Sequence, residues 1–166
     1  MRIAGVDPGT IVTGIGIIEE APKGPSLVFS RAIQPGSDKP IAIRLEIIFQ
    51  KLKAILEEWK PEVLALENVF FEKDFRAAIK VGEARAIAML AATVSGIPVV
   101  EYTPAQVKQS VCGNGRATKD QIQYMIRNLL KIREVLTADA ADALAVAICH
   151  SHSRKLNQIR REFSRV

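Results

Sequence analysis

The chain is poor in cysteine, histidine and aromatic residues, and it has no long apolar run. Its 166 residues include two cysteines and two histidines, and aromatic residues make up 5% of the total. Cys112 and Cys149 stand far apart and fit no metal-binding or redox spacing, so both are expected to be reduced thiols. No apolar stretch approaches the ~20 residues that a membrane-spanning helix needs. The sequence therefore argues against a disulfide scaffold, a cysteine–histidine metal site and a membrane protein.

The histidines and the N-terminal residues add little chemistry. His150 and His152 follow an alanine-rich segment and lie among polar residues, which favours a solvated helix end over a metal or acid–base site. Residues 1–4 enter a strand-like pattern at once and leave no room for a signal peptide. Together with the reduced thiols, this pattern predicts a cytoplasmic protein.

Length and charge suggest one domain with an affinity for polyanions. A chain of this length has the size of a single domain, which is expected to span residues 1–166. The net charge is +5, and basic residues are concentrated in a C-terminal tail of residues 154–166. A basic tail attracts phosphate backbones. A solvated helix end, kept soluble by its charge, explains the same residues equally well.

Apolar periodicity and turn signals divide the chain into strands and helices. The expected strands cover residues 2–7, 13–19, 27–33, 63–66 and 97–101. The expected helices cover residues 41–60, 74–95, 103–108, 118–131 and a last segment that Thr137 opens. Gly14 and Gly16 in the second strand permit the close approach of another backbone. The order β-β-β-α-β-α-β-α-α-α implies an α/β fold, a five-stranded mixed sheet with helices on both faces.

Four carboxylates occupy positions that a globular protein normally gives to apolar residues. Asp7 and Glu67 each end an apolar strand-like segment, whereas Asp139 and Asp142 interrupt an alanine-rich segment. A carboxylate that is withdrawn from water takes up a proton or pairs with a cation, because desolvating its charge is costly. If the four converge, they describe a site for a hard divalent metal. Oxygen ligands suit Mg²⁺ or Mn²⁺ rather than zinc.

The expected fold allows the carboxylates to meet. Ligands of such sheets gather beyond the carboxyl ends of parallel strands, so Asp7 and Glu67 share a cleft if their strands are parallel neighbours. Asp139 and Asp142 are three residues apart on one helix face, near its positive N-terminal end. Taken singly, each carboxylate is better explained as a structural residue of a turn, a strand end or a helix cap.

A cluster of this kind suits in-line attack on a phosphodiester. Two metal ions about 3.5–4 Å apart activate the attacking water and stabilise the leaving oxygen. The carboxylates bridge and position the ions, and no protein nucleophile is required. The sequence therefore favours a metal-dependent nuclease.

A combination of short segments, in a fixed order, is shared with a known family. The segments are Gly5-Val6-Asp7-Pro8-Gly9-Thr10 with Thr13-Gly14, then Glu67-Asn68-Val69-Phe70, then Gln106-Val107-Lys108-Gln109, then Asp139-Ala140-Ala141-Asp142-Ala143-Leu144-Ala145. This combination resembles the RuvC Holliday-junction resolvases, which have a ribonuclease H-like fold, and it covers nearly the whole chain. The combination is highly specific, whereas Asp-x-Gly near an N-terminus is weak on its own.

The resemblance implies a function and partners. It implies a homodimer that nicks two strands of like polarity symmetrically across a four-way DNA junction, in homologous recombination and DNA repair. It also implies Mg²⁺ as the cofactor, with two ions per active site and Mn²⁺ as a substitute. A branch-migration complex (RuvA and RuvB) is the implied protein partner. The alanine-rich helix over residues 74–95 supplies part of the dimer interface or packs on the sheet of its own subunit, and the sequence fits both.

The resemblance also assigns roles to residues. The catalytic carboxylates that bind metal are Asp7, Glu67, Asp139 and Asp142. Phe70 is expected to stack on an unpaired base, a contact worth ~1–3 kcal/mol. Lys108 and Lys119 are expected near the scissile phosphate. Without the resemblance, Phe70 is better explained as a core residue and the two lysines as ordinary exposed side chains.

Other functions fit parts of the sequence. An actin-like or sugar-kinase-like ATPase has a phosphate hairpin similar to Asp7-Pro8-Gly9-Thr10, but this chain has no second Asp-x-Gly hairpin. Intact carboxylates argue against a catalytically inactive DNA-binding module of the same fold. A nuclease for RNA/DNA hybrids fits the same chemistry, because a fold does not fix the substrate.

Overall fold

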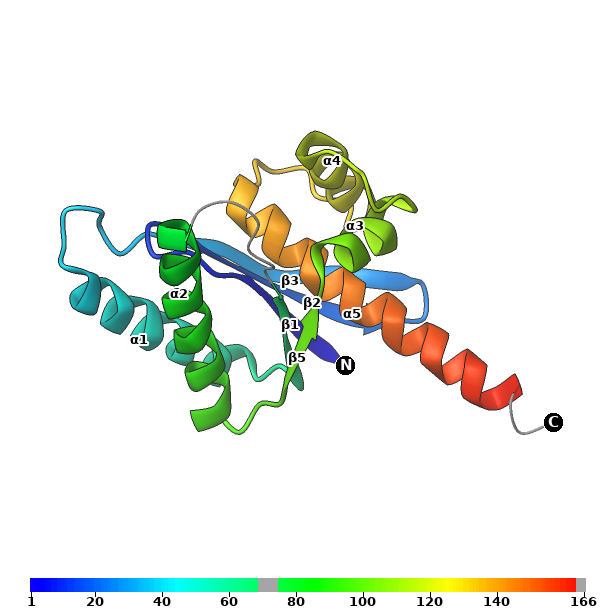
Figure 1. The fold of residues 1–166 in the computed structure, drawn as a ribbon. Coiled ribbons are helices and arrows are strands. Elements are labelled where there is room, and N and C mark those ends of the chain that lie inside the picture. Colours follow the sequence, from blue (N-terminus) through cyan, green and yellow to red (C-terminus); the bar gives the residue numbers. More distant parts are fainter. Residues whose placement is uncertain (69–74, 164–166) are drawn as a thin grey trace.

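One five-stranded sheet organises the protein, with helices on both of its faces as predicted (Figure 1). The structure is a computed structural model that describes residues 1–68 and 75–163, without the side chains of residues 75–77 and 159–163. The strands are β1 (Arg2–Asp7), β2 (Thr13–Ala21), β3 (Gly24–Ile33), β4 (Val63–Glu67) and β5 (Val99–Tyr102). They lie side by side in the order β3-β2-β1-β4-β5, which combines antiparallel and parallel pairs.

β1, β2 and β3 form the antiparallel meander that the turn signals predict. β1 pairs with β2 in a register that sets Asp7 opposite Gly14 and Gly5 opposite Gly16. β3 begins at Gly24, earlier than predicted. Gly24 has a φ of 113°, a conformation that glycine adopts readily and that allows a tight turn into β3.

β1 and β4 are parallel neighbours, which is the condition that a shared cleft requires. Val6 pairs with Leu66, so the next residues, Asp7 and Glu67, leave the sheet side by side. β4 pairs in parallel with β5, and Glu67 lies opposite Tyr102. The carboxyl ends of the parallel strands therefore share one edge of the sheet.

Two helices cover one face of the sheet, α1 (Ile41–Trp59) and α2 (Phe75–Val94) (Figure 1). The core on this face includes Val6, Ile15, Ile17, Ile48, Leu52, Leu66, Ala88, Ala91 and Ala92. Small alanine side chains allow α2 to lie close to α1 and the sheet. These alanines of α2 therefore pack within their own chain, and they are not available for a dimer contact.

Three helices cover the opposite face, namely α3 (Pro104–Cys112), α4 (Lys119–Leu129) and α5 (Ala138–Phe163) (Figure 1). The core on this face includes Ile3, Ile18, Val107, Val111, Ile122, Ile126, Leu144 and Ile148. α3 continues beyond the predicted end at Lys108, because Val107 and Val111 bury one side of the additional turn. α5 packs on β1 and β2, and its C-terminal end projects away from the sheet.

Threonine residues begin the helices of this face. Thr118 forms a capping box with Gln121, in which each side chain accepts a hydrogen bond from the other residue's backbone N–H. Thr103 and Gln106 form a second capping box at the start of α3. Thr137 opens α5 as predicted, and its hydroxyl accepts a hydrogen bond from the N–H of Ala140 at 3.4 Å.

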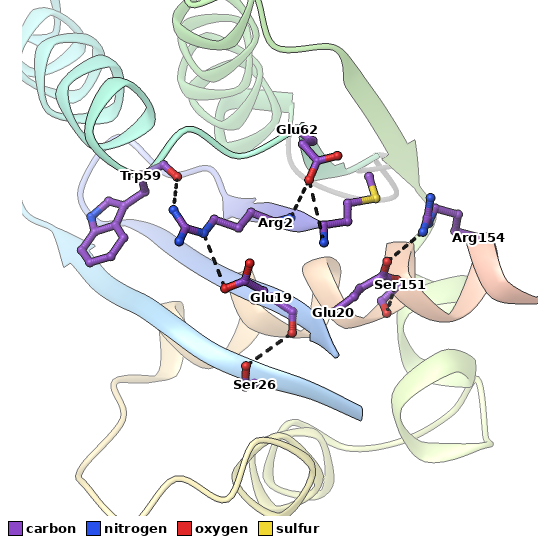
Figure 2. A network of polar contacts seen from close by, with 9 residues as sticks. Arg2, Glu19, Glu20, Ser26, Trp59, Glu62, Ser151 and Arg154 are labelled. Carbon is purple, nitrogen blue, oxygen red and sulfur yellow. Dashed lines mark hydrogen bonds and ion pairs between the residues drawn. The ribbon is translucent and has the colours of Figure 1, made fainter. Parts of the chain in front are cut away.

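Arg2 links several elements at the end of the sheet where β1 begins (Figure 2). Its guanidinium donates to the carbonyl oxygen of Trp59 at 3.0 Å and lies 3.7 Å from a carboxylate oxygen of Glu19. Its backbone N–H donates to the carboxylate of Glu62 at 3.1 Å. One arginine thus ties β1 to β2, to the end of α1 and to the residue before β4.

The C-terminal half of α5 is attached to the same end of the sheet (Figure 2). Glu20 in β2 accepts hydrogen bonds from the hydroxyl of Ser151 at 2.8 Å and from the guanidinium of Arg154 at 3.0 Å. The expected tail that begins at residue 154 is therefore the continuation of α5 to Phe163, and its first arginine is ion-paired.

The histidines lie inside α5, so the prediction that they mark a solvated helix end is wrong. The hydroxyl of Tyr102 and Nδ1 of His150 are 2.7 Å apart, and Nδ1 of His152 lies 3.0 Å from the carbonyl oxygen of Ser110. Both rings are half-buried. The prediction failed because α5 continues to Phe163, past the polar residues that suggested its end.

The structure also tests the predictions about the cysteines and about membrane-spanning helices. Cys149 is buried, Cys112 is partly exposed, and both are free thiols as predicted. Within residues 1–68 and 75–163, no helix combines the length and the apolar character that crossing a membrane requires.

Candidate active site

Asp7 and Glu67 end neighbouring strands and face the same side of the sheet. Side chains alternate between the two faces along a strand. Ile3 of β1 and Ala65 of β4 belong to the core beneath α3, α4 and α5. Asp7 lies four residues after Ile3 and Glu67 lies two residues after Ala65, so both carboxylates face the side that α5 covers.

α5 brings the other two carboxylates to this edge. A Cβ atom on Gly14 would lie far inside van der Waals contact of the Asp139 carbonyl oxygen and 3.2 Å from the Ala140 nitrogen. Gly14 is the residue that pairs with Asp7. The first turn of α5 therefore rests on β2 directly beside Asp7. Asp142 follows on the same side of the helix, because residues three apart share a helix face.

The pKa of Asp7 records the proximity of the other carboxylates. Burial is the largest cause that raises the pKa of Asp7 from 3.8 to about 7. The next causes, in decreasing order, are the negative charges of Asp142, Glu67 and Asp139. All the predicted carboxylates therefore lie within electrostatic range of Asp7, although they come from three separate parts of the chain.

The predicted lysines approach the same carboxylates. Burial raises the pKa of Glu67, and the charge of Lys108 opposes this effect. Burial also raises the pKa of Asp142, and the charge of Lys119 opposes it. The Nζ atom of Lys119 lies 3.8 Å from Oδ2 of Asp142, although the lysine side chain is 81% exposed. Both lysines act on the carboxylates electrostatically, and an exposed pair of this kind is weak.

The donor set fits a hard divalent cation in ligand type and charge. All the donors are carboxylate oxygens, and a cation would relieve the repulsion and the desolvation that raise the pKa of Asp7. In the described part of the chain, however, no group of acidic, histidine or cysteine side chains is close enough to hold an ion as it stands. Electrostatic coupling acts over a longer distance than coordination, so binding an ion would require the carboxylates to draw together.

The carboxylates do not line the hollow that α3 and α5 form. That hollow has a volume of about 800 Å³ and is lined by residues that include Gln106, Gln109, His152 and Leu156. None of the predicted site residues in the described part of the chain lines it. The carboxylates lie instead at the edge of the sheet and are half-buried.

Sequence reasoning gave Thr13 no role of its own, although it supports the turn behind Asp7. Its side chain is fully buried, and its hydroxyl donates to the carbonyl oxygen of Gly9 at 2.6 Å. The signal was a polar residue at the start of an apolar strand, since buried hydroxyls need a partner. Phe70, the predicted stacking residue, lies outside the described residues.

The sequence matches the family of the crossover junction endodeoxyribonuclease RuvC over residues 3–150. The chain belongs to the RuvC family. Crossover junction endodeoxyribonuclease RuvC of Pelotomaculum thermopropionicum is 50% identical over 153 residues, which cover 92% of this chain and 93% of that protein. RuvC of Geobacter sulfurreducens is 43% identical over 161 residues, which cover 97% of this chain and 98% of that protein.

Solved structures confirm the fold. Thermus thermophilus RuvC in complex with a Holliday junction substrate superposes with a TM-score of 0.88 at 31% identity, over 95% of this chain and 96% of that chain. The yeast mitochondrial Holliday junction resolvase Ydc2 has a TM-score of 0.69 at 11% identity, over 97% of this chain and 83% of that chain, a likeness of fold alone. The ribonuclease H-like α/β fold that the sequence predicts is therefore confirmed.

Proposed function

We propose that this chain is a structure-selective endonuclease that resolves four-way DNA (Holliday) junctions in homologous recombination and repair. The observation that carries the proposal is the gathering of carboxylates from β1, β4 and α5 within electrostatic range of one another, in a chain of the RuvC family. The RuvC relative that was solved with a Holliday junction substrate supports the substrate class. The reaction is the hydrolysis of a phosphodiester bond by water.

The proposed metal ligands and catalytic residues are Asp7, Glu67, Asp139 and Asp142. The proposed cofactor is Mg²⁺, with two ions per active site and with Mn²⁺ as a substitute. When bound, these ions supply the activation of the attacking water and the stabilisation of the leaving oxygen. A carboxylate must be ionised to hold a cation, and burial raises the pKa of Asp7 to about 7. Protonation of Asp7 therefore opposes metal binding on the acidic side of neutrality.

Lys119 and Lys108 are proposed to hold the phosphate backbone beside the carboxylates. Lys119 is largely exposed yet reaches Asp142, so its flexible side chain can also reach a phosphate oxygen bound at the same edge. Lys108 is half-buried and acts on the charge of Glu67. Each lysine would draw the negatively charged backbone towards the ligands while weakening the repulsion among them.

Stacking of Phe70 on an unpaired base at the junction is proposed on the family resemblance alone. The Phe70→Ala substitution should slow cleavage more than it weakens junction binding, because stacking would hold the base only in the reacting arrangement. Unchanged cleavage by this variant would rule out the role.

We propose a homodimer, because two equivalent active sites suit the symmetric nicking of two strands of like polarity. The side of α2 that faces away from its buried alanines supports this proposal. Ile79, Leu90 and Val94 share that side, and their exposed fractions are 47%, 49% and 53%. Sedimentation that finds only monomers at concentrations where the protein cleaves junctions would contradict the dimer.

The wider setting is proposed from the family resemblance. The chain would act as a single nuclease domain over residues 1–166, in the cytoplasm, with a branch-migration complex of RuvA and RuvB. Of its basic residues from 154 onward, those beyond the ion-paired Arg154 would add sequence-independent attraction to DNA. Failure of the protein to join RuvA and RuvB on a four-way junction would contradict the partnership.

The deciding experiment compares substrates in one assay with Mg²⁺. A synthetic four-way junction, a linear duplex of the same sequence and an RNA/DNA hybrid are each incubated with the purified protein. We expect paired nicks in two junction strands of like polarity and little cleavage of the other substrates. Preferred cleavage of the hybrid would replace the junction proposal with a hybrid nuclease. Absence of cleavage in all of them would reject a metal-dependent nuclease.

A further inference from the structure

Glycine residues of the β1–β2 hairpin lie directly against α5. Gly5 pairs with Gly16 across the hairpin, and Gly14 pairs with Asp7. None of the three glycines has a positive φ, so their strand backbone is one that any residue adopts. Glycine is therefore required at these positions for space and not for conformational freedom.

The obstruction at Gly14 is the helix backbone. An added Cβ atom would lie far inside contact of the Asp139 carbonyl oxygen and 3.2 Å from the nitrogen of Ala140. Gly5 is similar, since its added Cβ would lie 2.7 Å from the nitrogen of Ala147. Backbone atoms of a hydrogen-bonded helix cannot rotate away as a side chain does. A side chain at either position would therefore push α5 away from the sheet.

An added Cβ atom on Gly16 would meet a side chain first, in contrast to Gly5 and Gly14. Its added Cβ would lie 2.5 Å from Cγ and 2.6 Å from Cδ2 of Leu144, and 3.1 Å from the Leu144 nitrogen. The Leu144 side chain is fully buried, so moving it aside costs packing energy, but Leu144 lies after the first turn of α5 that carries Asp139. The alanine substitution at Gly16 should therefore cost packing energy without moving the first turn of α5.

We propose that Gly14 is a positioning residue of the active site, because its missing side chain lets the peptide of Asp139 rest on β2 beside Asp7. The close contact fixes the separation between the backbones that carry these two carboxylates. The inference rests on the proposed function, in which both carboxylates hold the same metal. Gly14 has no side chain to contribute a ligand and acts through the position of Asp139.

The displacement expected for Gly14→Ala is large enough to lower the cleavage rate strongly. A carbon atom and a carbonyl oxygen approach to ~3.3 Å at closest, so an alanine at this position would move the start of α5 by roughly 1 Å. Misplacement of a catalytic group by about 1 Å lowers rates by about 10²-fold. A glycine that served packing alone would change the stability of the protein and leave its metal affinity unaltered.

The test compares Gly14→Ala with Gly16→Ala, the matched control in the same strand. Mn²⁺ affinity of the metal-free protein is measured by calorimetry, and junction binding is measured in EDTA. We expect Gly14→Ala to bind Mn²⁺ at least ~10-fold more weakly and to cleave ~10²-fold more slowly. Its junction affinity should stay within about twofold, and Gly16→Ala should stay within about threefold in every measurement. Adding Asp139→Glu to Gly14→Ala should restore part of the Mn²⁺ affinity, because a longer side chain spans the added distance.

Equal Mn²⁺ affinities of the two variants would overturn the proposal. If Gly14→Ala does not fold, Gly5→Ala takes its place. Gly5 and Gly16 are paired across the hairpin, but an added Cβ atom would meet helix backbone at Gly5 and a side chain first at Gly16. Gly5→Ala should then bind Mn²⁺ more weakly than Gly16→Ala, and equal affinities would again overturn the proposal. Failure of the proposed function is recognised separately, because the unsubstituted protein would then neither bind Mn²⁺ through Asp7 nor nick a junction.

Discussion

The carboxylates at the two ends of the sheet differ in their charged partners. At the end where β1 begins, the acidic side chains of Glu19, Glu20 and Glu62 each have a cationic partner (Figure 2). Glu19 pairs with Arg2, Glu20 pairs with Arg154, and Glu62 lies 3.8 Å from the N-terminal amine. These pairs join separate elements, so their charges serve to hold strands and helices together.

At the end where β1 finishes, acidic side chains face one another. In the described part of the chain, Lys119 is the one cation that forms an ion pair with this cluster, and it is 81% exposed. Exposed pairs contribute about 0–1 kcal/mol, which does not offset the burial of several carboxylates. Charge that is left uncompensated lowers stability unless a ligand neutralises it. This contrast fits the proposal that the clustered acids, which Lys119 pairs only weakly, hold a metal, whereas the acids at the other end are structural.

The largest expected effect follows from removing one unpaired carboxylate. Asp7→Asn should slow single-turnover nicking of a four-way junction by at least ~10³-fold, because it removes several kcal/mol of transition-state stabilisation. Glu67→Gln should behave alike. Junction binding in EDTA should change little, since phosphate contacts elsewhere supply it. Glu20→Gln, at the paired end, is the control and should cleave normally. Nicking by Asp7→Asn within tenfold of the unsubstituted rate would contradict the assigned role.

A smaller effect concerns the stability of the metal-free protein as pH changes. The pKa of Asp7 is raised from 3.8 to about 7, so between these values the folded protein holds a proton that the unfolded chain has lost. The Asp7 contribution therefore makes folding less favourable as pH rises through this range, by at most ~1.4 kcal/mol per pH unit. The stability of Asp7→Asn relative to the unsubstituted protein should grow up to about pH 7 and then level off.

Urea unfolding in EDTA at several pH values measures this difference. Glu20→Gln again serves as the control, because Glu20 lies at the other end of the sheet, away from the carboxylate cluster. A difference between Asp7→Asn and the unsubstituted protein that is independent of pH would show that neither burial nor the neighbouring carboxylates raise the pKa of Asp7.

The smallest effect is expected from the lysine beside the cluster. Lys119→Met should slow junction cleavage by ~10-fold, the loss of about one charge-assisted contact to phosphate. It should also strengthen Mn²⁺ binding slightly, because a competing positive charge has been removed. Arg154→Met removes a cation from the paired end and should leave cleavage unchanged. Equal cleavage rates for the two variants, measured at low salt, would show that Lys119 holds no phosphate.

Local sequence patterns predicted the order of the elements because each was marked by short-range chemistry. Apolar alternation marked the strands, and the capping residues at Thr118 and Gln121 marked the start of α4. The order left open whether β1 and β4 are parallel neighbours, and the structure shows that they are. The end of α3 was missed, because burial of Val111 against the core extends a helix that its own residues do not.

The errors fall where a side chain finds a partner far away in the sequence. His150 and His152 were expected to be solvated, yet Tyr102 and Ser110 lie against them. Arg154 was expected in a basic tail, yet it pairs with a carboxylate of β2. Such partners come from strands and helices that come together only on folding, so no local sequence pattern predicts them.

The sequence by itself determined which elements form and which carboxylates stand in apolar surroundings, because both depend on neighbouring residues along the chain. Its short motifs also indicated the RuvC family. Only the tertiary structure decided that the peptide of Asp139 rests on Gly14 beside Asp7, and that the pKa of Asp7 rises to about 7. The physical reason is that van der Waals contact and desolvation depend on the distance between atoms in space, which packing sets and the order of residues does not.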